Sequence, residues 1–330
     1  MAFAHIIGTG SAAPDKVLTN EDLEGLVDTT DEWITRRTGI KQRRIACKGA
    51  NETTTELGTR AALNAMKMAD ISPNQIDAII VGTVTADHLF PSAACMIQKA
   101  LEANQAAAYD LSAGCSGFIY GLESANNSIR AGASKTVLVL GTERLSSIVN
   151  WKDRGTCVLL GDGAGAVIVQ SSDQRGGILS SHIQSDGRFW DLLHAQVGND
   201  YLPELLQDVE QRPYHLRMEG NRLFKQAVGC MTHIGELALS NNGLTRDDIK
   251  VVVPHQANLR ILQAVAEKMK IPMERVYTNL HKYGNTSSAS IPLALDEAHR
   301  DGKIERGDHV LLLSFGAGLT WGATVIEWTL

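Results

Sequence analysis

One cysteine of the 330-residue chain stands in a setting that suits nucleophilic chemistry. Cys115 lies in the string Asp110-Leu-Ser-Ala-Gly-Cys115-Ser-Gly-Phe118, between a predicted strand over residues 106–111 and a predicted helix that begins near Gly117. The positive end of a helix dipole favours the nucleophilic thiolate, and small neighbours let a substrate approach the sulfur. A buried structural role is the commoner fate of a single cysteine. We expect that role for Cys47, Cys95, Cys157 and Cys230.

A nucleophile needs a base or an electrophilic partner, and two loops offer candidates. His255 follows a predicted buried strand over residues 251–253, at the position where α/β proteins place groups that face a ligand. Asn285 lies in a loop of small residues before a predicted helix. A lone histidine or asparagine in a loop is usually a satisfied surface or capping group. Each residue is therefore only a modest candidate when it is taken alone.

Two glycine-rich strings could suggest phosphate binding, but both favour a simpler interpretation. Gly8-Thr-Gly10 fits the start of a dinucleotide-binding pattern, yet Pro14 and Asp15 interrupt the helix that this pattern requires. We predict a turn at the end of a strand there. Residues 161–166 lack the Lys-Ser/Thr ending of a phosphate loop, and we predict a glycine turn between strands.

The elements that must position these residues alternate between short β-branched or leucine runs and alanine-rich stretches. Strands are predicted over residues 76–84, 136–140, 251–253 and 309–313. Helices are predicted over residues 54–69, 93–102, 117–131, 220–241, 257–270 and 291–302. This alternation indicates α/β layers around largely buried sheets. The polar, turn-rich residues 171–217 predict a boundary or a long excursion.

Three pairs of similar segments share one spacing. Ile76 and Ile249 lie in matching turns into buried strands and are 173 residues apart (249 − 76). The strings that begin at residues 122 and 295, and those that begin at residues 137 and 310, have the same offset. A common offset close to half the chain favours two similar halves. The same register places Cys115 opposite Ser288.

The composition is that of an ordinary globular protein, with 44% hydrophobic and 21% charged residues. A net charge of −6 and a pI near 5.9 do not favour a partner made of nucleic acid or anionic membrane. Five cysteines without a Cys-x-x-Cys pair or metal-type spacing with histidine fit free thiols in a reducing cytosol. We expect no metal site, no signal peptide and no membrane-spanning segment.

Taken together, these motifs resemble the β-ketoacyl-acyl carrier protein synthase III family of the thiolase-like superfamily, over essentially the whole chain. The matching segments are residues 8–11, 27–34, 37–40, 90–95, the Cys115 turn, 153–156, 161–166, 254–260, 284–288 and 315–322. The resemblance implies an α/β fold of five layers, αβαβα, built from two duplicated halves. We expect residues 1–172 to form the half that carries the nucleophile and residues 173–330 the half that carries His255 and Asn285.

The resemblance also implies an acyltransferase that initiates fatty acid biosynthesis. Cys115 would accept an acyl group from acetyl-coenzyme A or a similar short acyl-coenzyme A. Backbone N–H groups of Cys115 and Ala317 would bind the oxyanion. After malonyl-acyl carrier protein loses carbon dioxide, His255 and Asn285 would stabilise the enolate that attacks the acyl-cysteine. No cofactor is expected, because coenzyme A is part of a substrate.

Further residues receive roles from the same resemblance. Trp33 and Arg154 would sandwich the adenine of coenzyme A. The other coenzyme A contacts would be Thr29, Arg37, Gly220, Phe224 and Asn258. Phe90 would reach across a homodimer into the partner's acyl pocket, although core packing is the alternative. An acidic carrier protein would dock on Arg222, Lys225, Arg260, Lys268 and Lys270, while Glu267 stands where well-known members carry lysine.

Three alternatives remain open at this level. A specialised relative in secondary metabolism would keep Cys115, His255 and Asn285 but use another acyl donor or acceptor. A cysteine hydrolase shares the chain order Cys, His, Asn with papain-like proteases, although their signature around the cysteine is absent. A non-catalytic dimeric binding protein would have a Cys115 that does not accept an acetyl group.

Overall fold

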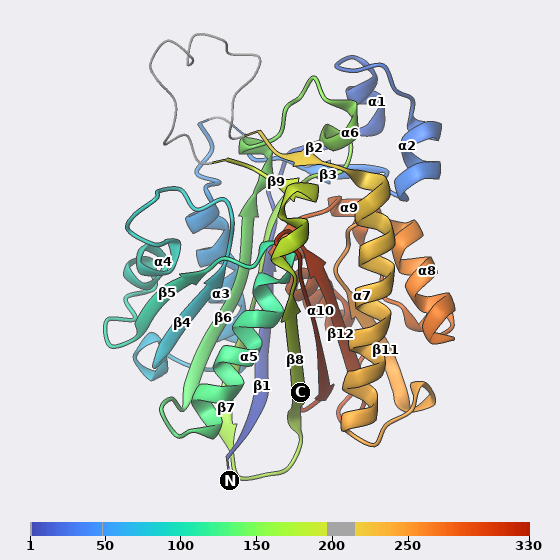
Figure 1. The fold of residues 1–330 in the computed structure, drawn as a ribbon. Helices are drawn as coiled ribbons and strands as arrows, with labels where there is room; N and C mark the ends of the chain where they lie inside the picture. Colours follow the sequence, from blue (N-terminus) through green and yellow to red (C-terminus); the bar gives the residue numbers. More distant parts are fainter. Residues whose placement is uncertain (1, 48, 197–214) are drawn as a thin grey trace.

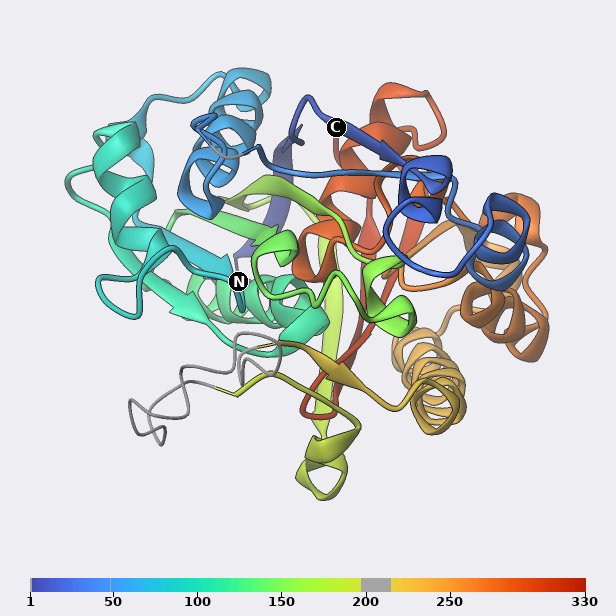
Figure 2. The same ribbon diagram turned by 90° about the horizontal axis from the view of Figure 1, so that it is seen from above.

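Two β-sheets form the centre of the molecule, with helices between them and on both outer faces (Figures 1 and 2). A computed structural model of the chain describes residues 2–47, 49–196 and 215–330. None of the helices in these ranges has the combination of length and apolar character that crossing a bilayer requires.

The two sheets repeat one strand pattern. The first sheet has the order β1 (Phe3–Ala12), β7 (Asp162–Ser172), β6 (Thr136–Arg144), β4 (Ala78–Gly82) and β5 (Ala107–Leu111). The second has the order β8 (Gly177–Ser185), β13 (Thr320–Glu327), β12 (His309–Gly316) and β11 (Ile249–Pro254). In each sheet the first three strands pair antiparallel with one another. The third strand, β6 or β12, then pairs in parallel with β4 or β11.

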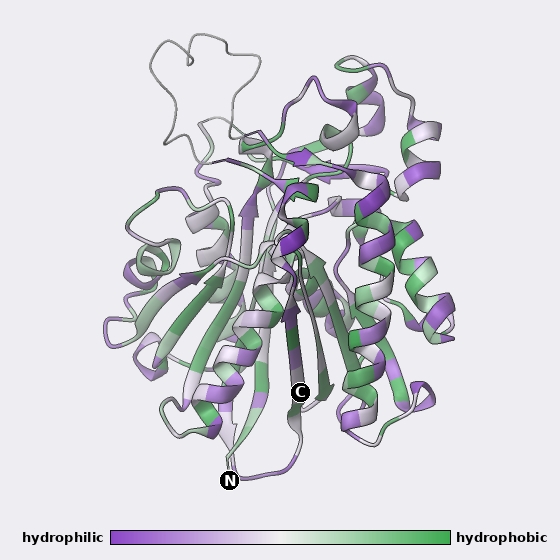
Figure 3. Ribbon diagram, viewed as in Figure 1, coloured by the Kyte–Doolittle hydropathy of each residue, from purple (hydrophilic) through white to green (hydrophobic). Residues whose placement is uncertain are grey.

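Three apolar clusters hold five layers together. The central cluster joins both sheets to α5 (Gly117–Arg130) and α10 (Ser290–Arg300), which lie between them. The helices α3 (Thr54–Ala69) and α4 (Ala93–Leu101) pack on the outer face of the first sheet. The helices α7 (Gly220–Asn241) and α8 (Leu259–Met269) pack on the outer face of the second. Hydrophobic residues accordingly concentrate in the strands, while the outer helices also carry hydrophilic residues (Figure 3). The predicted αβαβα layering is confirmed.

Shorter elements gather over one end of the sheets, at the top of Figure 1. They are β2 (Val17–Thr19), α1 (Asn20–Glu24), α2 (Asp31–Thr38), β3 (Gln42–Arg44), α6 (Arg154–Cys157), β9 (Leu193–His194), β10 (Arg217–Met218) and α9 (Leu280–Tyr283). These segments cover the region where the strands β4, β6, β11 and β12 end.

The offset of 173 residues recurs in the short helical turns. The turns η1 (Pro73–Gln75) and η8 (Arg246–Asp248) are 173 residues apart (246 − 73). The turns η2 (Gly114–Ser116) and η10 (Ser287–Ala289) have the same spacing (287 − 114). The duplication is therefore visible down to single turns. Cys115 and Ser288 occupy equivalent positions in the two halves.

The predicted turns at both glycine-rich strings were wrong, because these glycines lie within or beside long strands. Gly8 and Gly10 lie inside β1. A Cβ on Gly8 would come within 2.4 Å of the Ala65 carbonyl oxygen, and a Cβ on Gly10 would come within 2.3 Å of the Ala61 carbonyl oxygen. Both glycines therefore let α3 pack directly on the strand. Most of residues 161–166 lie in β7, where a Cβ on Gly165 would come within 2.5 Å of a backbone nitrogen of α10.

The expected excursion over residues 171–217 contains a strand that the sequence did not predict. The strand β8 forms an edge of the second sheet, and its last three residues are exposed. Its serine, histidine and glutamine side chains hide the apolar signal that a central strand would give. The turn η4 (Gly187–Leu192) follows. Residues 197–214 of this stretch lie outside the described residues.

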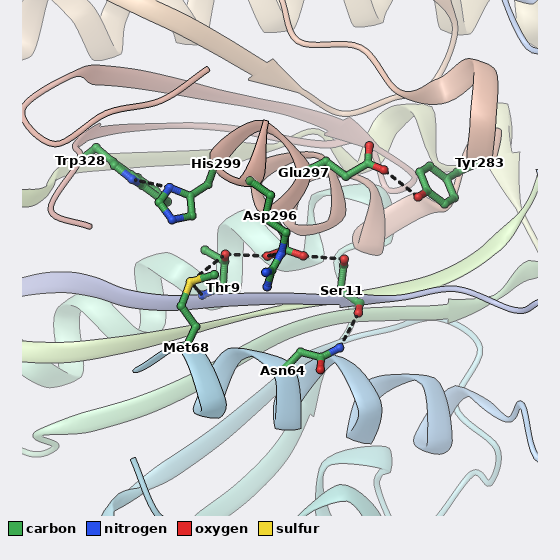
Figure 4. Close-up of polar contacts among 10 residues, drawn as sticks. Thr9, Ser11, Asn64, Met68, Tyr283, Asp296, Glu297, His299 and Trp328 are labelled. Carbon is green, nitrogen blue, oxygen red and sulfur yellow. Dashed lines mark hydrogen bonds and ion pairs between the residues drawn. The ribbon is translucent and has the colours of Figure 1, made fainter. Parts of the chain in front are cut away.

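A buried carboxylate ties α10 to the first strand (Figure 4). Asp296 is 2% exposed and accepts hydrogen bonds from the hydroxyls of Thr9 (2.7 Å) and Ser11 (2.6 Å). Arg300 donates a third from one turn further along α10, at 3.0 Å. Charge-assisted hydrogen bonds of this kind fix orientation as well as stabilise. They hold a helix of the second half against a strand of the first.

Substitution of Gly165 by alanine tests the close packing of α10 on β7. The new methyl group would overlap backbone atoms, so we expect the free energy of unfolding to fall by about 1–3 kcal/mol. Gly229, on the exposed side of α7, has no atom within 4 Å of its added Cβ. Gly229→Ala should therefore raise stability by up to about 1 kcal/mol. Equal effects of the two substitutions in urea unfolding would contradict this account.

Candidate active site

Cys115 lies in the turn η2, between the end of β5 and the start of α5. The preceding Gly114 has a left-handed φ of +52°, which few side chains tolerate. On the other side, a Cβ on Gly316 would come within 2.5 Å of the Cys115 backbone nitrogen. The two glycines thus let the loop after β12 lie directly against the cysteine, as a tight oxyanion site requires.

The Cys115 thiol is protonated at rest. Burial raises its pKa to about 11, and the nearby Glu143 carboxylate acts in the same direction. Hydrogen bonds from the Ser287 hydroxyl and from the backbone N–H groups of Cys115 and Ala317 oppose this effect but do not outweigh it. Desolvation thus opposes the thiolate that the helix end was expected to favour. The thiol must therefore lose its proton during the reaction.

His255 presents a neutral N–H group. It follows β11, is 2% exposed, and its Nδ1 lies 2.6 Å from the Ser290 hydroxyl oxygen. The Ser290 hydroxyl can donate its proton to Nδ1, and in that arrangement the ring proton lies on Nε2 as a donor. Burial lowers the pKa of His255 to about 4, so the imidazole is neutral at pH 7.

Asn285 is oriented in a comparable way. Its side-chain oxygen accepts a hydrogen bond of 2.8 Å from the Ser287 backbone N–H. Its backbone is held on both sides, by the Leu159 carbonyl at 2.8 Å and the Gly161 N–H at 3.0 Å. With the amide oxygen occupied, the NH₂ group remains as a donor. His255 and Asn285 can therefore offer two neutral donors to one developing negative charge.

One cavity of about 770 Å³ brings the predicted residues together. Cys115 comes from the first half of the chain, and His255, Asn285 and Ala317 come from the second. Apolar side chains form most of the remaining wall, among them Val84, Leu145, Ile148, Leu193, Leu223, Met231 and Phe315. Such a wall suits an apolar chain attached to a reactive carbonyl group.

A second cavity of about 530 Å³ adjoins the first. The residues that line both are Leu159, Met218, Gly220, Phe224 and Asn258. Of the predicted coenzyme A contacts, Trp33, Arg37, Arg154, Gly220, Phe224 and Asn258 line this second cavity. Thr29 lines neither cavity; its hydroxyl is buried without a hydrogen-bond partner among the described residues. The two cavities form a passage from a cationic, aromatic surface to Cys115.

Trp33 and Arg154 lie in direct contact. The Arg154 guanidinium carbon is 4.8 Å from the centre of the Trp33 ring, and Arg37 lies 5.9 Å from the same ring. An adenine ring that lies between the Trp33 ring and the Arg154 guanidinium needs about 7 Å between these two groups, which is twice an ordinary van der Waals contact distance. The predicted sandwich therefore requires the Trp33 ring and the Arg154 guanidinium to separate. Arg154 is held in its present position by a hydrogen bond of 2.7 Å to the Asp28 carbonyl.

The predicted docking cations do not form one cluster. Lys225 and Arg260 line the outer cavity, and Arg260 lies over the Phe224 ring at 5.8 Å. Arg222 is exposed on the same turn of α7 and pairs with Glu219 at 3.1 Å. Lys268 and Lys270 lie at the other end of α8, about 12 Å or more along its axis from Arg260. Only the first three residues surround the mouth of the passage.

Phe90 does not pack in the core of its own chain. It is 85% exposed, and the adjacent Leu89 is 80% exposed. Both lie in the loop between β4 and α4. The core alternative for Phe90 was therefore wrong.

Sequence reasoning missed three polar residues around the thiol. Glu143 is fully buried, Ser287 lines the cavity beside Cys115, and the Ser290 hydroxyl lies 2.6 Å from His255 Nδ1. Only one feature of the sequence could have pointed to any of them. The offset of 173 residues pairs the Cys115 turn with the turn that contains Ser287, but it does not show that the two turns touch.

The lowered pKa of His255 predicts a pH-dependent loss of stability. As the pH falls from 6.5 to 4, the unfolded chain binds a proton on this histidine and the folded chain does not, so folding weakens. Relative to a His255→Gln variant, the wild type should lose about 3 kcal/mol more between pH 7 and pH 4. Urea unfolding at four pH values measures this difference. Parallel curves for the two proteins would show that His255 titrates normally.

Comparisons with known proteins agree with this geometry. Residues 109–187 match the family described as 3-Oxoacyl-[acyl-carrier-protein (ACP)] synthase III, and residues 239–328 match its C-terminal family. The β-ketoacyl-[acyl-carrier-protein] synthase III of Caldanaerobacter subterraneus subsp. tengcongensis is 49% identical, over 99% of this chain and 98% of that protein.

Solved structures extend the likeness to the fold. The crystal structure of 3-oxoacyl-[acyl-carrier-protein] synthase III from Aquifex aeolicus has a TM-score of 0.92 at 47% identity, covering 98% of this chain and all of that one. A priming β-ketosynthase of the R1128 polyketide pathway has a TM-score of 0.93 at 35% identity, covering 99% of this chain and 96% of that one. This chain, with its duplicated thiolase-like fold, belongs to the β-ketoacyl-[acyl-carrier-protein] synthase III family of acyltransferases.

Proposed function

We propose that this enzyme condenses a short acyl-coenzyme A, acetyl-coenzyme A in particular, with malonyl-acyl carrier protein to initiate fatty acid biosynthesis. One observation carries the proposal. A protonated cysteine and two oriented neutral donors, His255 and Asn285, line a single apolar cavity that continues to the surface beside Trp33. This is the equipment that a thioester condensation needs, since it requires one nucleophile and one site for a negative oxygen.

In the first stage the Cys115 sulfur attacks the thioester carbonyl of the acyl-coenzyme A. The backbone N–H groups of Cys115 and Ala317, which point toward the sulfur, would stabilise the negative oxygen. Coenzyme A leaves and the acyl group remains on the cysteine. Trp33, Arg37 and Arg154 would hold the nucleotide end outside, with Thr29 near it, while Gly220, Phe224 and Asn258 line the route of the pantetheine arm.

In the second stage malonyl-acyl carrier protein loses carbon dioxide within the same cavity. The resulting enolate oxygen would accept hydrogen bonds from His255 Nε2 and Asn285 Nδ2. Its carbon attacks the acyl-cysteine and releases a 3-ketoacyl product. A neutral histidine suits this role because it can donate without first taking up a proton.

The carrier protein would dock at the mouth of the passage. Arg222, Lys225 and Arg260 supply positive charge there, which an acidic partner requires. Lys268 would contribute only if the partner also covers the far end of α8.

We further propose that the enzyme works as a homodimer. The edge of β5 has no partner strand among the described residues, and its Tyr109 side chain is 44% exposed. In a monomer, the large apolar side chains of the nearby Leu89 and Phe90 would remain exposed to water. Pairing across this edge would cover them and place Phe90 in the partner's acyl pocket. We expect a cytoplasmic enzyme that uses no cofactor, with its halves divided at residue 172.

The alternatives differ in how well they fit the site. A hydrolase needs a base that activates water, and the neutral, Ser290-bound His255 is poorly suited to that task. A specialised member of the family keeps some support, because the R1128 priming ketosynthase has the same fold at 35% identity. Eight relatives named β-ketoacyl-acyl carrier protein synthase III are more similar, at 46–50% identity, although a solved structure of 3-oxoacyl-acyl carrier protein synthase III is only 31% identical.

Intact mass spectrometry tests the proposed nucleophile. After incubation with acetyl-coenzyme A, the wild type should gain about 42 Da, the mass of an acetyl group that replaces a proton. Addition of malonyl-acyl carrier protein should remove the adduct. Cys115→Ala should gain nothing, whereas Cys95→Ala, which changes an exposed thiol, should behave as the wild type does. An adduct that survives in Cys115→Ala, or none in the wild type, would refute the assignment.

A further inference from the structure

The two proposed enolate donors lie on separate segments of the second half. His255 follows β11, Asn285 follows α9, and both line the large cavity. A displacement of about 1 Å at a catalytic group can cost about 100-fold in rate. Two donors that share one negative oxygen must therefore be held at a fixed position relative to each other. The contacts that can do so lie outside the lining of the cavity.

Gln256 fixes the segment that carries His255. It is the next residue along the chain and is 1% exposed. Its Nε2 donates a hydrogen bond of 2.8 Å to the Pro254 carbonyl, and its Oε1 accepts one of 3.0 Å from the Asn279 backbone N–H. The side chain thus joins the end of β11 to the start of the segment that leads to Asn285.

Glu297 of α10 continues this connection, and Figure 4 shows its contact with Tyr283. Its Oε1 accepts a hydrogen bond of 2.7 Å from the Tyr283 hydroxyl, and its Oε2 accepts one of 2.9 Å from Asn279 Nδ2. The Lys282 ammonium lies 3.6 Å from Oε1. Both carboxylate oxygens are therefore used to hold residues 279–283. Charge-assisted hydrogen bonds of this kind restrain direction as well as distance.

The position of Tyr283 influences that of Asn285. Only Gly284 separates them, and its φ of +68° lies in the left-handed region that favours glycine. The Tyr283 carbonyl oxygen packs against Gly161, where an added Cβ would come within 2.1 Å of it. Gly161 in turn donates its N–H to the Asn285 carbonyl at 3.0 Å. A shift of Tyr283 would therefore be passed on to Asn285.

The same helix also contacts His255 directly. The Ser290 hydroxyl, at the start of α10, lies 2.6 Å from His255 Nδ1. Ser290 and Glu297 are seven residues apart (297 − 290), or about two turns, so they lie on the same side of the helix. One side of α10 thus contacts His255 near its beginning and the segment before Asn285 near its end. Asp296 anchors this helix to β1.

We propose that three side chains hold the two enolate donors in register on α10. They are Gln256, Tyr283 and Glu297, and all three lie outside the lining of the large cavity. Each is therefore a positioning residue that acts through a donor rather than on the substrate. The inference rests on the proposed role of the two donors in condensation. Because the attack of the cysteine on acyl-coenzyme A does not use these donors, the network should matter to condensation and not to acylation.

A double-mutant cycle of Tyr283→Phe and Asn285→Ala tests the proposal. Rapid-quench mass spectrometry follows the acetyl adduct as malonyl-acyl carrier protein consumes it, corrected for loss of the adduct without that substrate. Tyr283→Phe removes one hydroxyl and should slow this consumption about tenfold, while acetylation changes less than about twofold. In the Asn285→Ala background the same change should alter consumption less than about twofold, because the amide through which Tyr283 acts is gone.

Glu297→Gln tests the other branch of the network. An amide keeps the size of the carboxylate but accepts hydrogen bonds at only one of its two terminal atoms. The variant should slow consumption of the adduct at least about tenfold and leave acetylation within about twofold of the wild type. Part of this effect should persist in the Asn285→Ala background, since the contact of Glu297 with Asn279 leads through Gln256 to His255.

Tyr120→Phe is the matched control, because the Tyr120 hydroxyl donates a hydrogen bond of the same length, 2.7 Å, to the Gln184 carbonyl. It should leave both steps within about twofold of the wild type. Normal consumption of the adduct in Tyr283→Phe and Glu297→Gln would overturn the positioning role. So would a tenfold effect of Tyr283→Phe that persists in the Asn285→Ala background. A wild type that forms no adduct would instead refute the proposed function.

Discussion

The structure depends on one close approach between its two halves. The turns η2 and η10 meet in the centre of the molecule, where side chains of ordinary size would keep them apart. A Cβ on Gly141 would come within 2.1 Å of the Ser288 carbonyl oxygen, and a Cβ on Gly114 within 2.8 Å of the Ala317 backbone nitrogen. Because these glycines are present, the cysteine turn of one half and the loop of the other share a single cavity.

This approach explains the division of chemistry between the halves. Duplication gave both halves a short turn before a central helix, but only the first turn carries a thiol, and its counterpart carries Ser288. The second half instead supplies the donors His255 and Asn285 and the hydroxyl of Ser287. Each half alone would lack part of the site. Polar contacts such as those of Asp296 then hold the halves in this register.

The sequence predicted those features that depend on local pattern. The helix over residues 54–69 and the helix over residues 220–241 match α3 and α7 residue for residue, because apolar periodicity and capping act locally. It failed where tertiary packing decides. The glycines of β1 look like turn residues until α3 is placed against them, and the polar edge strand β8 looks like a loop.

At the site, the resemblance to the synthase III family identified the residues, but their pKa values could be derived only from the structure. The raised pKa of Cys115, the lowered pKa of His255 and the position of Glu143 all follow from burial, which no local pattern encodes. Likewise, the contact between Arg154 and Trp33 depends on two segments that are 121 residues apart (154 − 33).

In the proposed reaction the cysteine carries acylation, while the two neutral donors serve condensation. The most direct test follows the acetyl adduct of His255→Ala and Asn285→Ala by rapid-quench mass spectrometry, first with acetyl-coenzyme A and then with malonyl-acyl carrier protein. Acetylation should stay within about tenfold of the wild type, while consumption of the adduct should slow at least about 100-fold. Equal losses in both steps, or unchanged consumption of the adduct, would contradict the account.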